Sequence, residues 1–403
     1  MAKGRGQKAL SKRPRKPTLK VQLEGIPESR HVAYARKQWQ DRQGSIIIDG
    51  PVPNNRKGVL GKIKIPDEII ELRDRGALFV SNHSGGKDSQ AMHILLESFV
   101  PREQLVVVHA DLGDVEWDGL KEHIARTTGM WPLVAKASTK DFFDMVLQRE
   151  MFPSPIYRQC TSDLKTSPSN SLVLNYLKGH PYYDKMVVNC VGLRAEESSK
   201  RAKQSLLKVN TDQSIAGRIW VRWLPIHDLS EQDVFKLIEE AGQEPHPIYK
   251  TGMKRCSCQF CIMASDSDLR LAATLSPRMY ARYVAAEQLL NFTFKNPEKG
   301  QRPRFLPDIT GINPDAIMLA EEYSKLVKRK QELDEAKRDR DLFLKGKTTA
   351  PATEAQLRQR LRTIVEATKR LLLQPVVPDE HIKRLREESR AIAAKLKAAK
   401  LKG

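Results

Sequence analysis

Residues 77–89 constrain the fold of this chain more than any other stretch. Residues 77–80 are a short apolar run of the kind that forms a buried strand. A glycine-containing turn follows, and beyond it Ala91, Ile94, Leu95 and Phe99 recur at the spacing of one helix face. Where a strand meets a helix N-terminus through such a turn, backbone N–H groups and the helix dipole attract an anion. The stretch therefore predicts a phosphate site.

The turn consists of Ser84, Gly85, Gly86, Lys87, Asp88 and Ser89. The two glycines permit positive φ angles and a close approach of the backbone to a ligand. The lysine adds a cation, the serines add hydroxyl donors, and the aspartate is suited to capping the helix. The spacing differs from the Walker loop, which places four residues between its first glycine and its Gly-Lys pair. An ordinary glycine turn without a ligand is the alternative interpretation.

Short apolar runs alternate with helical patterns over the next 150 residues. Strands are expected at 77–82, 105–110, 133–135, 186–192 and 220–224, and helices at 66–75, 88–99, 118–128, 141–147 and 230–241. This alternation predicts an α/β fold, a Rossmann-like doubly wound parallel sheet. Ligands of such sheets bind at the carboxyl ends of the strands, where the glycine turn lies.

The positive charge of the chain is concentrated at its ends. Residues 1–20 contain eight Lys or Arg and no acid, and residues 321–403 contain 22 basic and 13 acidic residues. The two ends therefore carry +17 of the net charge of +20. A nearly neutral centre with basic ends is typical of a catalytic domain with appendages that bind DNA or RNA. A solvated tail and a charged helical surface are the alternative.

Four regions are expected along the chain. They are a basic arm and irregular segment (1–64), a nucleotide-binding domain (65–265), a helical and linker segment (266–315) and a basic helical extension (316–403). In the second half, helices are expected at 264–292, 315–345, 353–373 and 379–401, and an irregular segment at 296–315. The last three helices suit an oligomerisation or partner-binding arm, as a homo-oligomer or with another protein. No run of 18 apolar residues and no apolar signal core are present, so we expect a cytoplasmic protein without a membrane partner.

Two further groups of candidate site residues follow predicted strands. Asp111 follows the second strand, where an acid can hold Mg²⁺ or a ribose hydroxyl. Gly192 and Arg194 follow the fourth, and an arginine there can bind a phosphate or sulfate with two hydrogen bonds. Arg201 lies seven residues further on and would share a helix face with Arg194. Polar loops without a ligand are the alternative in both cases.

The five cysteines do not suggest a disulfide framework, because they are odd in number and three lie within six residues. Cys256, Cys258 and Cys261 with the distant Cys160 would supply four thiolates to zinc or to an iron–sulfur cluster such as [4Fe–4S]. A redox-active pair or inert buried thiols are the alternatives. Cys190 lies within a predicted strand and is expected in the core.

These motifs together resemble the phosphoadenosine-phosphosulfate (PAPS) reductase family of the adenine-nucleotide α-hydrolase (PP-loop) superfamily. The similar stretches are 84–89, 109–113, 158–165 with Pro168, 192–198, 224–234, and 247–255 with Cys258 and Cys261. They occur in the family's order and cover about residues 75–265. The resemblance implies a PP-loop (HUP-type) sheet, a nucleotide held by residues 84–89, and Arg194 near its phosphates or sulfate.

Two departures from that family bear on the reaction. The chain has no cysteine after Cys261, where thiol-dependent PAPS reductases carry their nucleophile, and Cys160 is followed by Thr161 rather than by a second cysteine. The pattern is nearer to the sulfur-transfer components of DNA phosphorothioation systems and to phage PAPS-reductase-like proteins. We therefore expect an enzyme that hydrolyses ATP at the α-phosphate with Mg²⁺, with Lys87, Asp88 and Asp111 catalytic, in sulfur transfer to or modification of nucleic acid. A PAPS reductase that uses an external thiol and a non-catalytic nucleic-acid-binding module are the alternatives.

Overall fold

The computed structural model describes residues 57–344, except 216, 257, 298, 299 and 301, together with the isolated positions 359 and 363. Residues 1–56 of the basic arm and irregular segment expected at 1–64 lie outside the described residues. So do the helices expected at 353–373 and 379–401, apart from those two positions. The chain divides into two compact units, 1–330 and 331–403. All the contacts that follow lie within the first unit.

A six-stranded sheet forms the centre of the first unit, in the order β3-β2-β1-β4-β6-β5. The strands are β1 (Leu78–Asn82), β2 (Leu105–Ala110), β3 (Leu133–Ala135), β4 (Met186–Val191), β5 (Leu207–Val209) and β6 (Ile219–Trp223). All neighbouring strands are parallel except β5, which pairs antiparallel with β6. The α/β Rossmann-like fold and its five predicted strands are confirmed. The short edge strand β5 was not predicted, because Lys208 interrupts its apolar residues, whereas the equally short β3 is apolar throughout.

Helices connect the strands and continue beyond them. They are α3 (Gly58–Lys62), α4 (Asp67–Asp74), α5 (Lys87–Glu97), α6 (Leu120–Thr128), α7 (Phe142–Arg149), α8 (Gln159–Thr161), α9 (Ser167–Gly179), α10 (Ser199–Ala202), α11 (Glu231–Glu240), α12 (Asp266–Leu275), α13 (Pro277–Leu290), α14 (Leu306–Thr310) and α15 (Ala316–Leu344). None of the described helices is long and apolar enough to cross a bilayer.

Three helix predictions need correction. The single helix expected at 264–292 is wrong: it is two helices, because Pro277 has no N–H to continue the first and begins the second. The segment 296–315, expected to be irregular, contains the short helix α14. Helix α9 was not predicted. It is preceded by a π-helical turn, Ser162–Thr166.

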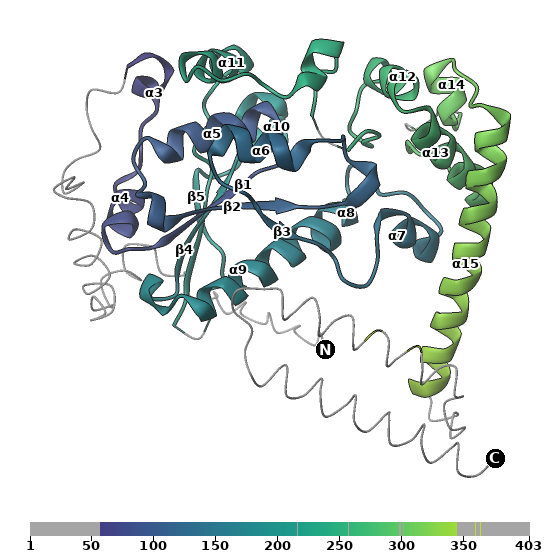
Figure 1. The fold of residues 1–403 in the computed structure, drawn as a ribbon, viewed down its shortest axis with the longest axis horizontal. Helices are drawn as coiled ribbons and strands as arrows, with labels where there is room; N and C mark the ends of the chain where they lie inside the picture. The colour runs from purple at the N-terminus through teal and green to yellow at the C-terminus, as the bar shows by residue number, and fades with distance from the viewer. Residues whose placement is uncertain are drawn as a thin grey trace, which may run out of the picture. The chain divides into compact units, whose positions relative to one another are not determined.

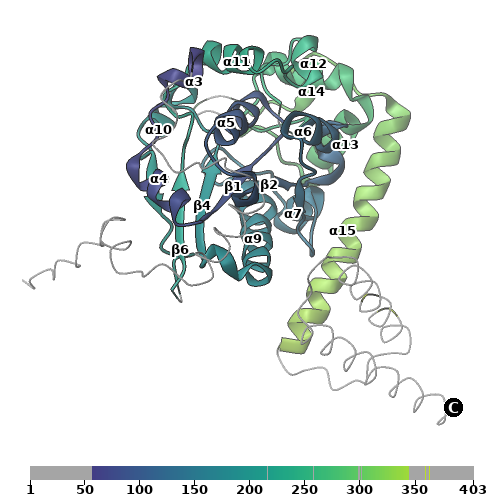
Figure 2. The same cartoon turned by 60° about the vertical axis from the view of Figure 1, so that its left-hand side comes forward.

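The two faces of the sheet are covered by different helices (Figures 1 and 2). Phe79 of β1 points to the face where α4, α5 and α11 pack, and Leu78 and Val80 point to the face covered by α9. This alternation follows from the two-residue period of a strand, and burial on both faces accounts for the continuous apolar runs in the sequence. Cys190 of β4 is fully buried, so its assignment to the core is confirmed.

Candidate functional site

The turn between β1 and α5 has room for backbone only. Gly85 has a φ of +80°, and a side chain at Gly86 would place its Cβ 3.0 Å from the carbonyl oxygen of Cys256. Helix α5 begins at Lys87 with Gly86 as its N-cap, and no side chain caps it. The prediction that Asp88 caps the helix is therefore wrong, because its carboxylate is engaged elsewhere.

Hydrogen bonds within the turn fix its shape. The Ser84 N–H donates to Ser89 Oγ (3.2 Å), and that hydroxyl donates to the carbonyl oxygen of Gly86 (2.8 Å). The Gly85 N–H donates to Nδ1 of His83 at 3.1 Å. Burial lowers the pKa of His83 well below its usual value, so the ring stays neutral and Nδ1 remains an acceptor. Sequence analysis missed His83, although its place between strand and glycine turn was a usable signal.

The cations at the start of α5 are paired with carboxylates. Lys87 is buried, and its Nζ lies 3.1 Å from Glu231 and 3.6 Å from Asp88. Asp88 also accepts from Nε of Arg194 at 2.6 Å, and Arg194 reaches Glu196 with a second nitrogen at 2.5 Å. A phosphate that binds here meets two positive charges, but it competes with three carboxylates for them.

Two residues distant in sequence pack against the start of α5. A Cβ at Gly192 would lie 2.8 Å from the carbonyl oxygen of Asp88, so the chain after β4 passes too close for a side chain. The hydroxyl oxygen of Tyr249 accepts the backbone N–H groups of Lys87 (3.1 Å) and Cys256 (3.2 Å). The structure therefore brings the segments at 84–89, 192–194 and 249–256 together.

Arg201 lies near this group, but not as predicted. Ser198 has an extended backbone between the 3₁₀ turn Ala195–Glu197 and α10, so Arg194 and Arg201 do not share one helix face. Both contact Glu197 instead: Arg201 forms an ion pair with it, and Arg194 donates its backbone N–H to it at 3.1 Å. Glu197 is thus the residue that connects the two arginines.

The acidic loop after β2 is held by partners of its own. Asp111 accepts the Gly113 N–H at 2.7 Å and lies 3.5 Å from Lys121. Burial tends to raise the pKa of Asp111, but the Gly113 N–H and Lys121 outweigh it and lower the pKa. Asp114 pairs with Arg282 of α13 at 2.5 Å. Among the described residues, no three His, Cys, Asp or Glu side chains form a group that could hold a metal ion, so the magnesium site stays a prediction.

The cysteine segment lies on this acidic loop. Cys258 and Glu116 form an antiparallel bridge, and the Gln259 N–H donates to the carbonyl oxygen of Val115 at 2.8 Å. The Gln259 side chain donates to the Glu116 carbonyl oxygen at 2.6 Å. The loop after β2 therefore positions the cysteines at the same edge of the sheet as the glycine turn.

The four candidate ligand cysteines do not have equivalent surroundings. Cys160, Cys258 and Cys261 lie near Lys165, whose pKa is raised chiefly by its proximity to Cys258. Cys256 lies against Gly86, donates its backbone N–H to Tyr249 and is also near Cys258, and burial raises its pKa to about 12. In the part of the chain that the structure describes, the thiols do not form a metal-binding group. The zinc or iron–sulfur centre therefore remains a prediction, and we assign no chemical step to it.

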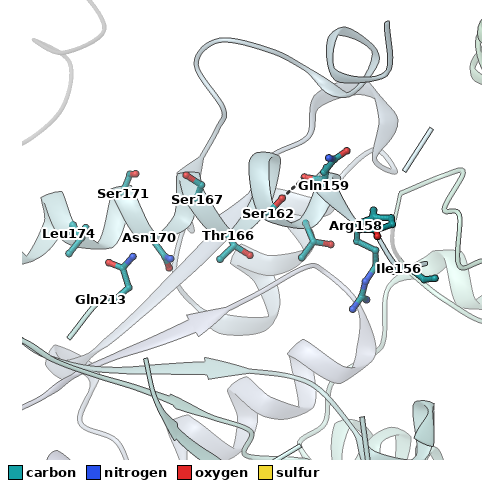
Figure 3. Close-up of a pocket in the computed structure, with 12 residues that line it drawn as sticks. Ile156, Arg158, Gln159, Ser162, Thr166, Ser167, Asn170, Ser171, Leu174 and Gln213 are labelled. Atoms are coloured by element: carbon teal, nitrogen blue, oxygen red, sulfur yellow. Dashed lines mark hydrogen bonds between the residues drawn. The ribbon is translucent and has the colours of Figure 1, made fainter. Parts of the chain in front are cut away.

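An open groove of about 670 Å³ runs along α8 and α9 (Figure 3). Arg158 is the one charged side chain among its lining residues, and Tyr157 beside it is 72% exposed. Hydroxyl and amide side chains provide most of the remaining surface: Gln159, Thr161, Ser162, Thr166, Ser167, Asn170, Ser171 and Gln213. A polar groove without acids is compatible with an anionic or sugar-containing ligand.

The glycine turn lies at the carboxyl edge of a parallel sheet, with the cations Lys87 and Arg194 beside it. This arrangement is typical of nucleotide-binding α/β domains of the PP-loop class. The sequence comparison is specific: residues 78–264 match the phosphoadenosine phosphosulfate reductase domain. The match covers a little under half of the chain. The chain is also 28% identical over 255 residues to an uncharacterised 37.8 kDa protein of Escherichia phage 186, covering 51% of this chain and 73% of the phage protein.

Two solved structures show a weak similarity to the chain. One is phosphoadenylyl-sulfate (PAPS) reductase from Candida auris in a phosphate complex, with a TM-score of 0.31, 11% identity, and coverage of 63% of this chain and 98% of that one. Another is FMN adenylyltransferase from Candida glabrata in complex with FAD and pyrophosphate. Its TM-score is 0.31 and its identity 13%, and the match covers 60% of this chain and 69% of that one. Similarity at this level carries no substrate over to the present chain.

Proposed function

We propose that this chain is an ATP α-hydrolase that adenylates an acceptor and releases pyrophosphate, and that it acts in sulfur transfer to or modification of nucleic acid. The observation that carries the proposal is the junction of β1 and α5, where a glycine turn meets the buried Lys87 and the Asp88–Arg194 pair. The match of residues 78–264 to the PAPS reductase domain supports nucleotide use.

In the proposed reaction an acceptor oxygen attacks the α-phosphorus of ATP. A new P–O bond forms to the acceptor, the bond between the α-phosphorus and the bridging oxygen breaks, and pyrophosphate leaves with that electron pair. Lys87 and Arg194 neutralise the charge that develops on the leaving group, and the backbone of 84–89 orients it. Catalysis is then chiefly positioning and electrostatics.

Carboxylates pair with Lys87 and Arg194, so a bound phosphate must replace one or more of them. Glu231 is 53% exposed and lies 3.1 Å from Lys87, so a phosphate can replace it without burying an unpaired acid. Asp88 is held by two cations and is proposed to keep them in place. Asp111 is proposed to act on the bound nucleotide. It accepts the Gly113 N–H, and among the described residues it does not belong to a group of three side chains that could hold Mg²⁺.

Nucleic acid is the proposed acceptor, on the strength of two features. The ends of the chain carry most of the net charge of +20, which favours a polyanion. The groove along α8 and α9 has a cation, an exposed tyrosine and no acid among its lining residues. Tyrosine and arginine at such a groove suit the stacking of a single-stranded base and contact with its phosphate.

The test is release of pyrophosphate from Mg-ATP, together with transfer of the AMP group to candidate DNA or RNA. Lys87→Ala should abolish pyrophosphate release and weaken ATP binding roughly 10- to 100-fold, since it removes a charge-assisted contact. Lys62→Ala is the matched control, because Lys62 pairs with Asp233 on the surface at 3.0 Å. Equal activity of the wild type and Lys87→Ala would refute the proposal.

A second candidate is reduction of PAPS with an external thiol. It is favoured by the match of residues 78–264 to the PAPS reductase domain. It predicts stronger binding of PAPS than of ATP and thioredoxin-dependent release of sulfite. A thermal-shift panel of ATP, PAPS and their products separates the two candidates, because each predicts a different preferred nucleotide.

A further inference from the structure

A single hydroxyl group connects the phosphate turn with the cysteine segment. The Tyr249 oxygen, in the 3₁₀ turn Pro247–Thr251, accepts the N–H of Lys87 at 3.1 Å and the N–H of Cys256 at 3.2 Å. It also lies 3.2 Å from the position that a Cβ on Gly86 would occupy. Lys87 begins α5, and Cys256 begins the run of clustered cysteines, so one oxygen atom positions both segments.

The surroundings of Tyr249 keep the hydroxyl protonated and in place. Its ring packs edge-on to Phe235 with centroids 5.8 Å apart, and the Lys87 Nζ lies 5.3 Å from its centroid. Burial raises the pKa of Tyr249 well above its usual value. Its oxygen already accepts two N–H groups, so the remaining function of the hydroxyl is to donate its own proton.

No acceptor for that O–H group is found among the residues that the structure describes. The oxygen lies next to Gly86, on the turn where a phosphate would bind. An anion on the turn is thus the natural acceptor for the Tyr249 proton. A hydrogen bond to an anion is about twice as strong as a neutral one, and it polarises the hydroxyl that Cys256 contacts.

We infer that Tyr249 is a positioning residue that couples occupancy of the phosphate turn to the order of the cysteine segment. This inference rests on the proposed function, because it assumes that residues 84–89 bind the phosphates of a nucleotide. It extends that proposal by giving the nucleotide a second effect. Binding at the turn holds Cys256, and the segment that follows it, in a fixed position before any later step at the thiols.

Hydrogen–deuterium exchange of the full chain, with and without sodium pyrophosphate, tests the coupling. Peptides covering 84–90 report on the turn, and peptides covering 253–260 report on the cysteine segment. In the wild type, pyrophosphate should slow exchange in both, by about fivefold or more at the amides involved. In Tyr249→Phe it should still slow exchange in 84–90, but no longer in 253–260.

Tyr280→Phe is the matched control, since its buried hydroxyl bonds to Thr310 and Ile312 instead. This variant should behave as the wild type in both peptides. Protection confined to the turn in the wild type, or equal protection of 253–260 in Tyr249→Phe, would overturn the coupling while leaving the phosphate site intact. No protection of 84–90 in the wild type would refute the phosphate site itself, and the coupling with it.

Discussion

The Nε atom of Arg194 lies 2.6 Å from the Oδ1 atom of Asp88. Arg194 follows β4 and Asp88 lies in the first turn of α5, which follows β1, so the pair connects the ends of two adjacent parallel strands. Burial alone would lower the pKa of Arg194, but Asp88 and Glu196 outweigh it and raise the pKa. The arginine is therefore a fixed cation beside the turn, and part of its charge is already neutralised.

Replacing Asp88 with asparagine tests whether this carboxylate competes with a bound anion. The loss of one negative charge between Lys87 and Arg194 should strengthen pyrophosphate binding by about 1 kcal/mol, or about fivefold. Asp67→Asn is the control, because Asp67 lies in the first turn of α4. Calorimetric titration of each variant gives the affinities. Weaker binding in Asp88→Asn would mean that its positioning of the cations outweighs the competition.

The contact between His83 and the turn predicts a selective loss of binding. His83→Ala removes the acceptor of the Gly85 N–H, and it should weaken ATP binding about fivefold in a titration. His93→Ala is matched in chemistry and burial, but its ring bonds to Ser81 of β1 at 3.1 Å. That variant should lose stability without losing affinity. Equal affinity losses in both variants would show a general packing effect rather than support of the turn.

Gly192 is expected to tolerate no side chain. In Gly192→Ala the new Cβ would meet the Asp88 carbonyl oxygen at 2.8 Å, and both groups belong to backbones that cannot rotate away. We expect a loss of about 1–3 kcal/mol in the free energy of unfolding and weaker pyrophosphate binding. Gly311→Ala, where the Cβ meets open space, should lose stability through its φ of +69° but bind pyrophosphate normally. Normal binding by Gly192→Ala would contradict this prediction.

The sequence was sufficient to predict the sheet because each main strand is buried on both faces. The run at 105–110 is a clear example, since its apolar residues pack against helices on both sides and its bounds agree with β2. The turn at 84–89 was predictable for a similar reason: a strand, two glycines and a helix start are all local features. Helix α9 lacks such a signal, because its hydroxyl-rich face lines an open groove and blurs the helical period.

The partners of the turn could not be predicted, because they come from distant segments. Glu231 and Tyr249 lie about 145 and 160 residues beyond Lys87, and only the folded sheet brings them to it. The spacing of the cysteines suggested one cluster, but the backbone bridge at Cys258 fixes the course of the segment there. Cys256 lies against Gly86 and near Cys258, while Cys258 and Cys261 lie near Lys165. Spacing predicts which thiols are neighbours in sequence, not which way each one points.

Glu287 of α13 should make the stability of the fold depend on pH. Its fully buried carboxylate accepts the N–H groups of Phe294 (2.7 Å) and Leu306 (2.8 Å), which fixes the chain between α13 and α14. Burial outweighs these two bonds and raises its pKa to about 7. The unfolded chain loses this proton near pH 4.5, so the native state binds more protons between pH 4.5 and 7.

The contribution of Glu287 to the free energy of unfolding is therefore fully present below pH 4.5, and it is lost as the pH rises through about 7. Over that range the loss amounts to roughly 3 kcal/mol. Glu287→Gln cannot titrate. The unfolding free energy of the wild type minus that of the variant should therefore fall by about this amount from pH 5 to pH 8. Urea unfolding at each pH measures it, with Glu122→Gln on α6 as a control. A difference that stays constant with pH would mean that Glu287 is charged throughout, and that its two N–H bonds outweigh its burial.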